Sequence, residues 1–400
     1  MSGAELSRPL EGIRILDLSR ILSGPYCTAI FADMGAEVIK LERPGNGDDT
    51  REFYPIKDGE SGYYIAANRG KKGITVDLSS EKGKEIVHRL LEEADVLVEN
   101  FRPGATKKLG LDYESLKDRY PKLVYASISG FGQNTSRSRE PAYDIVIQAQ
   151  CGLMELTGFP DGPPVKVGTS IIDITAGLYA CIGILSALRS REFTGKGQHV
   201  DVSMLDVGLS ILENAVPRCT MMDESPRRNG NASFFTAPFN AYQTKDGYIV
   251  LAAPNNKLWG QLCDIIGKPE RTNIPELTTL ADRMANSHLV EAVVSEWAAG
   301  LTNDEACRLL AEAKIPASPV RSVKEALADP YVAERGMLAS VTHPTLGTVT
   351  IPNLPIQFSG TPSNAEVCSP GLGEHNREIL SGMLGMSDSE MEQLSIEGVI

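Results

Sequence analysis

The sequence predicts an α/β protein in which a large domain is built on a mostly parallel β-sheet and is joined to a smaller α+β domain. Over the first 200 residues, short apolar segments rich in β-branched residues alternate with helix-like segments, which is the order of βαβ units. A polar stretch then interrupts this alternation, and a second series of turn and helix signals follows. A chain of 400 residues is long enough for two domains.

Six segments of the first half are expected as strands, because they are short and apolar and lie between turn or helix signals. They are Gly12–Ser19, Ala36–Glu42, Ile74–Leu78, Val96–Phe101, Leu123–Ser129 and His199–Ser203. Helices are predicted at Gly24–Gly35, where Pro25 suits a first helical position, at Glu81–Glu93 and at Met204–Val216.

The composition changes after residue 220. The stretch "MMDESPRRNGNASFFT" is polar and contains Pro and Gly, so it predicts a linker or loop. Beyond it, "AYQTKDGYIVLAAP" predicts a hairpin with an Asp246-Gly247 turn. Helices are expected near Asn256–Ile266, Leu289–Ala299 and Asn303–Ala313, and the tail predicts another hairpin and a helix at Asn376–Leu384. We therefore expect a large domain over 1–220, a linker over 221–239, a small domain over 240–330 and a return segment over 331–400.

Charge and composition exclude several classes of function. The formal net charge of −13 disfavours binding to nucleic acid or to an anionic membrane. The seven cysteines form no CxxC and the five histidines form no HxxxH, so neither a disulfide framework nor a metal site is expected. The N-terminus lacks the pattern of a signal peptide, and no stretch reaches the ~18 uninterrupted apolar residues of a membrane span. These observations predict a cytoplasmic protein.

Basic residues gather near the expected strand ends in spite of the acidic total. They are Arg43, then Arg69, Lys71 and Lys72, then Arg102, Lys107 and Lys108. Ligands of open α/β sheets bind outside the carboxyl ends of the strands, so this recurrence favours a ligand with separated phosphates. For any single residue, a solvated surface side chain is the commoner explanation. A dinucleotide is disfavoured, because the turn "SRILSGPYC" after the first strand lacks the GxGxxG fingerprint.

Asp173 is the one charged residue after Lys166 in the apolar stretch "VKVGTSIIDITAGLYACIGIL". One interpretation is structural, because Asp is a favoured N-cap and a helix running to about Arg189 would follow it. The other is chemical, because a positioned, ionised carboxylate can act as a nucleophile. The two are compatible if the helix dipole and free N–H groups keep the carboxylate ionised. The small residues that follow, such as Gly177, predict close packing of this helix.

Several ordered motifs together resemble the family III CoA-transferases, of which formyl-CoA transferase and carnitine CoA-transferase are familiar members. The motifs are "GPYCTAIFADMGAEVIKLERPGNGDDTR", "NRGKKGITVDL", "DVLVENFRPGATKKLGLDYESL", "SISGFGQ", "AYDIVIQAQCGLMELTG", "DGPPVKVGTSIIDITAGLYACIGILSALRSREFTGKGQHVDVSMLD" and "LGEHNREIL". The resemblance implies a Rossmann-like large domain built from the N- and C-terminal segments, a smaller domain, and an interlocked homodimer of ring-like chains.

The resemblance also implies roles for individual residues. Asp173 in "SIIDITAG" takes the place of the family's nucleophile, which attacks an acyl-CoA thioester to form a mixed anhydride and then an aspartyl-CoA thioester. Backbone N–H groups near Asp173 and in a glycine-containing loop are expected to stabilise the oxyanions. The CoA-contacting positions are Ile21, Arg43, Val76, Asn100, Phe101 and Lys108, with Lys71 or Lys72 near the phosphates. Tyr143 is expected to line the acyl site, and Leu22 stands where formyl-CoA transferase has Gln.

The function implied is transfer of CoA from a donor such as succinyl-CoA to a small carboxylic acid, with a short dicarboxylic or branched acid preferred and with no permanently bound cofactor. Two alternatives remain open: an acyl-CoA racemase or isomerase on the same scaffold, which Tyr143 disfavours, and a non-catalytic CoA-binding protein, which Asp173 disfavours. Arg227 and Arg228 are candidates for binding a distal carboxylate, beside the commoner role of solvated loop arginines.

Overall fold

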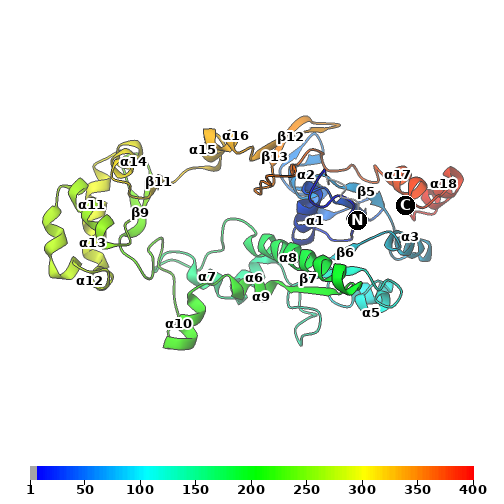
Figure 1. The fold of residues 1–400 in the computed structure, drawn as a ribbon, viewed down its shortest axis with the longest axis horizontal. Coiled ribbons are helices and arrows are strands. Elements are labelled where there is room, and N and C mark those ends of the chain that lie inside the picture. Colours follow the sequence, from blue (N-terminus) through cyan, green and yellow to red (C-terminus); the bar gives the residue numbers. More distant parts are fainter. Residues whose placement is uncertain (1–6) are drawn as a thin grey trace. The chain divides into compact units, whose positions relative to one another are not determined.

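The computed structural model describes residues 7–400, and the chain divides into two compact units (Figure 1). The large unit comprises residues 7–152, Val167–Glu213 and Pro330–Ile400, and the small unit comprises Leu153–Lys166 and Asn214–Asp329. The stretch expected as a linker, 221–239, is thus part of the small unit, and the tail expected as a return segment lies in the large unit.

A six-stranded, fully parallel sheet is the centre of the large unit, in the order β5-β2-β1-β6-β7-β8. Counted among these six strands alone, the order is that of dinucleotide-binding Rossmann sheets, with the strand order reversing between β1 and β6. The bounds of these strands agree with the predicted bounds within a few residues, so the six predictions are confirmed. Their bounds are β1 Arg14–Asp17, β2 Glu37–Glu42, β5 Lys72–Thr75, β6 Val96–Glu99, β7 Val124–Ser129 and β8 His199–Ser203.

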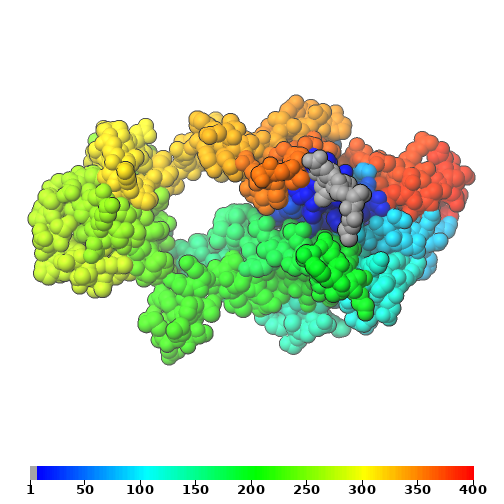
Figure 2. Space-filling model, in the orientation of Figure 1, coloured from blue at the N-terminus to red at the C-terminus, as the bar shows by residue number. Residues whose placement is uncertain are grey.

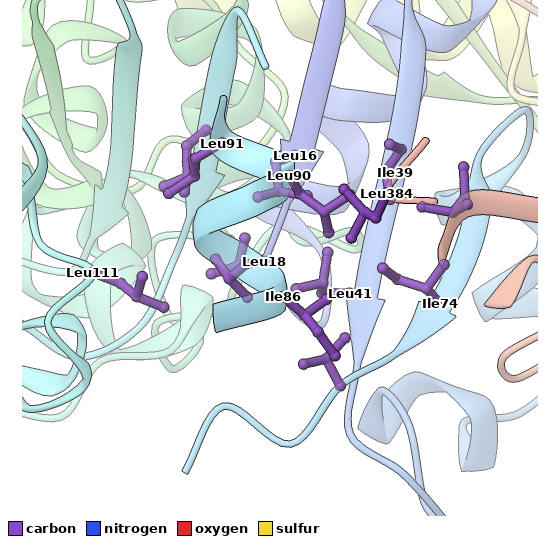
Figure 3. Packing of buried hydrophobic residues seen from close by; sticks show 14 of the residues in the cluster. Leu16, Leu18, Ile39, Leu41, Ile74, Ile86, Leu90, Leu91, Leu111 and Leu384 are labelled. Carbon is purple, nitrogen blue, oxygen red and sulfur yellow. The ribbon is translucent and has the colours of Figure 1, made fainter. Parts of the chain in front are cut away.

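Helices cover both faces of this sheet, as they must when parallel strands are joined by crossovers. Helices α1 (Ser23–Asp33) and α8 (Ile171–Thr194) pack together and against the strands on one face. Figure 3 shows the other face, where Leu16 and Ile39 of the sheet meet Leu90 of α3 (Glu81–Leu91). This core also contains Leu384, which comes from the C-terminal segment.

The C-terminal helices α17 (Asn376–Gly382) and α18 (Asp388–Ile396) complete the large unit, and Figure 2 shows these red residues beside the blue and cyan ones. Asn376 accepts a hydrogen bond from the backbone N–H of Thr75 at 2.8 Å and donates to its Oγ1 at 2.8 Å. The edge strand β5 is therefore capped by a segment that lies 301 residues further along the chain.

The remaining elements of the large unit are short. They are the 3-10 turn η1 Asp49–Glu52, the strands β3 Ile56–Lys57, β4 Glu60–Ser61, β12 Leu338–His343 and β13 Gly347–Pro352, and the helices α2 Gly62–Asn68, α4 Ala105–Leu109, α5 Tyr113–Leu116, α6 Asp144–Gln150, α9 Met204–Ser210 and α16 Pro330–Glu334. β12 and β13 form the hairpin predicted for the tail.

The small unit is an antiparallel sheet, in the order β11-β10-β9, packed against helices around Trp259 and Leu310. The predicted hairpin about Asp246-Gly247 is formed by β9 and β10. The elements are β9 Phe239–Gln243, β10 Tyr248–Ala252, β11 Ala317–Pro319, α7 Leu153–Leu156, α10 Ala215–Met222, α11 Asn256–Ile266, α12 Leu280–Ala285, α13 Ser287–Ala299, α14 Asn303–Glu312, α15 Val323–Leu327, η2 Pro269–Asn273 and η3 Pro275–Leu277.

Helix α8 is apolar and closely packed. By length and composition alone it could cross a membrane, since an 18-residue window has a mean hydropathy of 1.9. It packs against α1, β7, β8 and α9 inside the large unit, as a core helix does. A Cβ on Gly177 would lie 2.7 Å from the carbonyl oxygen of Ser23, so the close packing predicted from the small residues of α8 is confirmed there.

Two buried ion pairs lie beneath the carboxyl ends of β1 and β2. Asp17 Oδ2 accepts hydrogen bonds from Lys71 Nζ at 2.9 Å and from Thr28 Oγ1 at 2.6 Å. Lys71 Nζ also donates to the carbonyl oxygen of Pro25 and to Asn68 Oδ1, which uses all three of its protons. Lys40 pairs with Asp48 in the same way at 2.8 Å. These four charged side chains are at most 1% exposed.

Replacing Lys71 by Met tests this arrangement. The change leaves the Asp17 carboxylate buried without its cation, so we expect the free energy of unfolding to fall by about 3–5 kcal/mol. Arg189→Met, which breaks the exposed pair with Glu192, should cost less than about 1 kcal/mol. Urea unfolding measures both values, and equal effects would contradict the role of the buried pair.

Candidate functional site

Two adjoining cavities lie at the carboxyl edge of the parallel sheet, where the strand order reverses. The larger, of about 330 Å³, is lined by residues that end or follow β1, β2, β5 and β6, including Arg20, Arg43 and Val76. The smaller, of about 120 Å³, is lined by residues that follow β1, β6 and β7, and by Asp173. We call the second one the Asp173 cavity. Phe101 lines both cavities, so they are neighbours.

The loop between β1 and α1 forms part of both cavities in a strained conformation. Ile21 has a φ of 68°, in the left-handed region that β-branched residues rarely adopt. Its backbone N–H lies 3.2 Å from each carboxylate oxygen of Asp48. The side chain of Asn100 forms two hydrogen bonds with the backbone of Arg20, the residue before Ile21. It accepts from the N–H of Arg20 at 2.8 Å and donates to its carbonyl oxygen at 2.7 Å. These bonds hold the strained backbone in place.

Asp48 is ionised because its partners outweigh its burial. Burial raises the pKa of this carboxyl, but Lys40 and the hydrogen bonds from Thr50 lower it to about 2. The negative charge is therefore present at neutral pH, and it anchors the N–H of Ile21. The sequence did not single out Asp48, although it lies in the quoted "PGNGDDTR".

Glu99 fixes the turn that presents Asn100 and Phe101. Its Oε2 accepts a hydrogen bond from the backbone N–H of Phe101 at 2.8 Å, which ends β6 two residues earlier than expected. Burial raises the pKa of Glu99 to about 7. Phe101 is half-buried and lines the two cavities.

Asp173 is not the N-cap of its helix. Helix α8 begins at Ile171 with Ser170 as N-cap, so Asp173 is the third helical residue. The capping interpretation is therefore wrong by three positions. Among residues 7–400, no side chain or backbone N–H donates a hydrogen bond to its carboxylate, which lines the Asp173 cavity. The carboxylate is thus held by the backbone of α8 and presented to the cavity.

The N–H groups that begin α8 are occupied by another carboxylate. Asp144 Oδ1 accepts hydrogen bonds from the backbone N–H of Ile172 at 2.8 Å and of Asp173 at 3.2 Å. Asp144 already uses these groups, so the expectation that they serve as oxyanion donors is wrong, whereas the glycine-containing loop stays a prediction. The expectation that the helix terminus keeps Asp173 ionised also fails. Burial, and then the charge of Asp144, raise the pKa of Asp173 to about 7.

Three further residues lie near Asp173. Tyr63 and Glu140 were not predicted, and Arg102 was expected only among the basic residues that would favour a ligand with separated phosphates. Tyr63 of α2 is close enough that burial, and then the charge of Asp173, raise its pKa to about 12. Arg102 and Glu140 both line the Asp173 cavity. Glu140 is paired with Arg137 at 2.8 Å, whereas Arg102 forms no ion pair within the described chain. Arg102 follows β6 in the quoted motif "NFRPG".

The structure brings most of the sequence-predicted residues to these cavities. Arg43 and Val76 line the larger cavity, and Phe101 lines both. The Asp173 cavity is lined by Ile21, Leu22, Asn100, Tyr143 and Asp173. Lys108 is exposed on α4 and lines neither, although its neighbour Leu109 lines the larger one. Arg20 and Asp77, which also line the larger cavity, were not predicted.

Lys71 and Lys72 do not belong to this group. They lie where β5 begins, whereas the cavities adjoin the carboxyl ends of the strands. Lys71 is buried against Asp17, and Lys72 pairs with Glu37 and Glu378, each at 2.8 Å. We therefore withdraw both lysines from the phosphate-binding set. Arg227 and Arg228 lie in the small unit, where Arg228 pairs with Glu155 at 2.6 Å.

The arrangement is suited to covalent chemistry on a carboxylate. Asp173 has an open face and is half ionised near pH 7, so it can attack an acyl carbon at neutral pH. The larger cavity, with Arg20 and Arg43 at its wall, offers cations to an elongated anionic ligand whose reactive end enters the Asp173 cavity at Phe101.

Comparison with known proteins agrees with these features. A model of the family described as CoA-transferase family III matches residues 10–376. Acetyl-CoA:oxalate CoA-transferase of Acetobacter aceti is 40% identical over 353 residues, which are 88% of this chain and 90% of that protein. Succinyl-CoA:glutarate CoA-transferase of Mus musculus is 36% identical over 401 residues, which cover 100% of this chain and 92% of that protein.

The fold agrees as well. The solved structure of a CAIB/BAIF family protein from Brucella suis has a TM-score of 0.85 and 38% identity to this chain, and the match covers 94% of this chain and 100% of that one. The resemblance read from the motifs is thereby confirmed over nearly the whole length. The chain belongs to CoA-transferase family III.

Proposed function

We propose that this CoA-transferase moves CoA from an acyl-CoA donor such as succinyl-CoA to a small dicarboxylic acid, with Asp173 as the nucleophile. The observation that carries the proposal is the position of the Asp173 carboxylate. It lines a cavity at the point where the strand order of a Rossmann-like sheet reverses, and it has no hydrogen-bond partner in the described chain. The donors and acceptors named for the two relatives, succinyl-CoA, glutarate and oxalate, support this substrate class.

In the first half of the reaction, the ionised Asp173 carboxylate attacks the thioester carbonyl and the C–S bond breaks. This gives a mixed anhydride between Asp173 and the donor acyl group, and a CoA thiolate. The thiolate then attacks the Asp173 carbonyl of the anhydride, which releases the donor acid and leaves an aspartyl-CoA thioester. The activation of the thioester is thus kept on the enzyme.

In the second half, the carboxylate of the acceptor acid attacks the aspartyl-CoA thioester and expels the CoA thiolate, forming a second mixed anhydride. The thiolate attacks the acceptor's acyl carbon, which yields the new acyl-CoA and restores the Asp173 carboxylate. Each anhydride is sensitive to water, so a small cavity of about 120 Å³ suits this sequence of steps.

The CoA moiety would occupy the larger cavity. Arg20 and Arg43, which both contact Asp49, are the two arginines at its wall. Phosphate groups compete with Asp49 for these guanidinium groups. The thiol arm would pass Phe101 to reach Asp173, because Phe101 is shared by both cavities.

A racemase is the alternative with an observation in its favour, since a carboxyl with a pKa of about 7 is also suited to proton transfer. Transfer is preferred because the family resemblance leads us to expect a histidine acid/base at this point in a racemase, whereas this chain has Tyr143, which lines the Asp173 cavity. A racemase would exchange the α-hydrogen of a 2-methylacyl-CoA with deuterium from the solvent when no acceptor acid is present.

We further propose a homodimer in the cytoplasm. Leu178, Ile182 and Phe193, at 42%, 59% and 73% exposure, form an apolar face on α8 that a second copy would bury. All seven cysteines are free thiols, which agrees with a reducing compartment.

Sedimentation equilibrium should give twice the mass of one chain, and Ile182→Glu should weaken the dimer. A wild-type mass of one chain would contradict this proposal, and cell fractionation tests the location.

Replacing Asp173 by Asn should abolish transfer while CoA still binds, because the amide has nearly the same shape but is not a nucleophile. Incubation of the wild type with succinyl-CoA should add the mass of a CoA thioester, seen by intact-protein mass spectrometry, and the variant should stay unmodified. Asp118→Asn, at an exposed position, is the matched control. If the Asp173→Asn variant transferred CoA at the wild-type rate, the mechanism would be refuted.

Replacing Arg102 by Gln tests the choice of a dicarboxylic acid. Arg102 is the unpaired cation of the Asp173 cavity, so we expect it to bind the distal carboxylate. A charge-assisted hydrogen bond contributes about 1.5–3 kcal/mol, so the KM for glutarate should rise roughly tenfold or more. The KM for butyrate should change little. An equal change for both acids would show that Arg102 does not select the second carboxylate.

A further inference from the structure

Asp144 and Gln148 form a buried clamp on the first turn of α8. Besides bonding the N–H groups of Ile172 and Asp173, Asp144 accepts a hydrogen bond through Oδ2 from Gln148 Nε2 at 2.5 Å. Gln148 Oε1 accepts from the backbone N–H of Val167 at 2.9 Å, so the clamp also holds the segment that enters α8. Asp144 is 8% exposed and Gln148 is fully buried.

We propose that Asp144 is a positioning residue that sets the reactivity of Asp173. One carboxylate has two effects: it occupies the helix N–H groups that would otherwise stabilise the charge of Asp173, and it places a second negative charge beside it. The proposal rests on the proposed role of Asp173 as nucleophile and adds what makes that carboxylate reactive.

The physical reason is that a helix N-terminus ordinarily lowers the pKa of a carboxyl in its first turn. Here the pKa of Asp173 is raised instead, to about 7, by burial and by Asp144. A more basic carboxylate is a stronger nucleophile once ionised, by the same Brønsted relation that governs acid–base catalysis. Asp144 therefore takes up the N–H groups that would lower the pKa of Asp173 and, after burial, adds to the rise of that pKa.

Other ionisable groups face Asp173, and the test has to leave them unchanged. They are Tyr63 on α2, Arg102 after β6, and Glu140 and Tyr143 ahead of α6. None of them hydrogen-bonds Asp144 or Gln148 within the described chain. A change confined to the clamp thus alters one charge near Asp173 and keeps the rest of its surroundings.

The double variant Asp144→Asn/Gln148→Glu moves the charge without removing a hydrogen bond. The Oδ1 of the new amide can still accept from the N–H groups of Ile172 and Asp173, and its Nδ2 can donate to the new carboxylate at position 148. The other oxygen of that carboxylate can accept from the N–H of Val167. If the double variant does not fold, the single variant Asp144→Asn takes its place. It removes the charge but loses the hydrogen bond from Gln148, because an amide nitrogen replaces the accepting oxygen.

The first readout is the rate at which the enzyme forms its CoA thioester from succinyl-CoA, measured against pH by rapid quench and mass spectrometry. The wild-type rate should rise with pH through about 7, because Asp173 must be ionised. In the double variant the midpoint, which is the pH at which the rate is half of its maximum, should fall by about one unit, since a like charge has been moved away from Asp173. At pH 9, where both are ionised, the double variant should be slower.

The second readout does not depend on activity. Asp173 is more easily protonated in the folded state than in the unfolded chain, where its pKa is about 3.9. Its ionisation therefore opposes folding, and the stability advantage of Asp173→Asn over its parent should grow as pH rises from about 4 through about 7. The same substitution in the double-variant background should show a smaller growth. Denaturant unfolding across this pH range measures both.

These outcomes separate the two proposals. Asp118→Asn should leave the midpoint and the stability difference at their wild-type values, because it removes an exposed charge that does not line the Asp173 cavity. A folded double variant with an unchanged midpoint and an unchanged stability difference would overturn the role of Asp144. Transfer that survives Asp173→Asn would instead overturn the nucleophile, and the stability measurement would still report whether Asp144 acts on Asp173.

Discussion

The backbone between β1 and α1 is the constraint on which both cavities depend. Ile21 stands at a φ of 68°, and no local feature of the sequence favours that conformation. It is imposed by Asp48 from the loop after β2 and by Asn100 from the end of β6. The buried Lys40 in turn fixes Asp48. A strained loop at a ligand site is therefore maintained by a buried ion pair and an amide side chain from neighbouring strands.

Helix α8 serves stability and chemistry with different parts of its length. Its middle packs against α1 so closely that Gly177 has no space for a side chain, and this contact holds the helix in place. Its first turn, by contrast, presents a carboxylate that is costly to ionise. The rigidity of the packed part is what allows the first turn to hold an unfavourable charge in one orientation.

Much of the fold could be predicted because its signals are local. The six strands are apolar segments between turns, and α11 was predicted with its bounds, Asn256–Ile266. The short elements, such as α2 and the hairpin of β3 and β4, were not predicted, because they owe their form to tertiary contacts such as that between Phe53 and Tyr63. The confirmed family resemblance supplied the return of the tail to the large unit.

The site was predictable only where residue type and strand position sufficed. Asp173 stood out because a carboxylate in an apolar stretch is rare, and Arg43 because it follows a strand. The prediction for Lys71 was wrong because the residue is close in sequence to other basic residues but lies where β5 begins, away from the carboxyl end that adjoins the cavities. Asp144 was missed because its partners are 28 and 29 residues away, and nothing in the sequence marks a side chain that caps another helix.

The way in which β5 is closed has a consequence for synthesis. An open parallel edge strand exposes unpaired N–H groups and invites pairing with other chains. In this protein the N–H groups of Gly73 and Thr75 on that edge are satisfied by His375 and Asn376. A nascent chain can thus complete its strands early on the ribosome, but one border of the sheet stays open until the last tenth of the sequence emerges. Chaperone contact during translation is expected to persist over that interval.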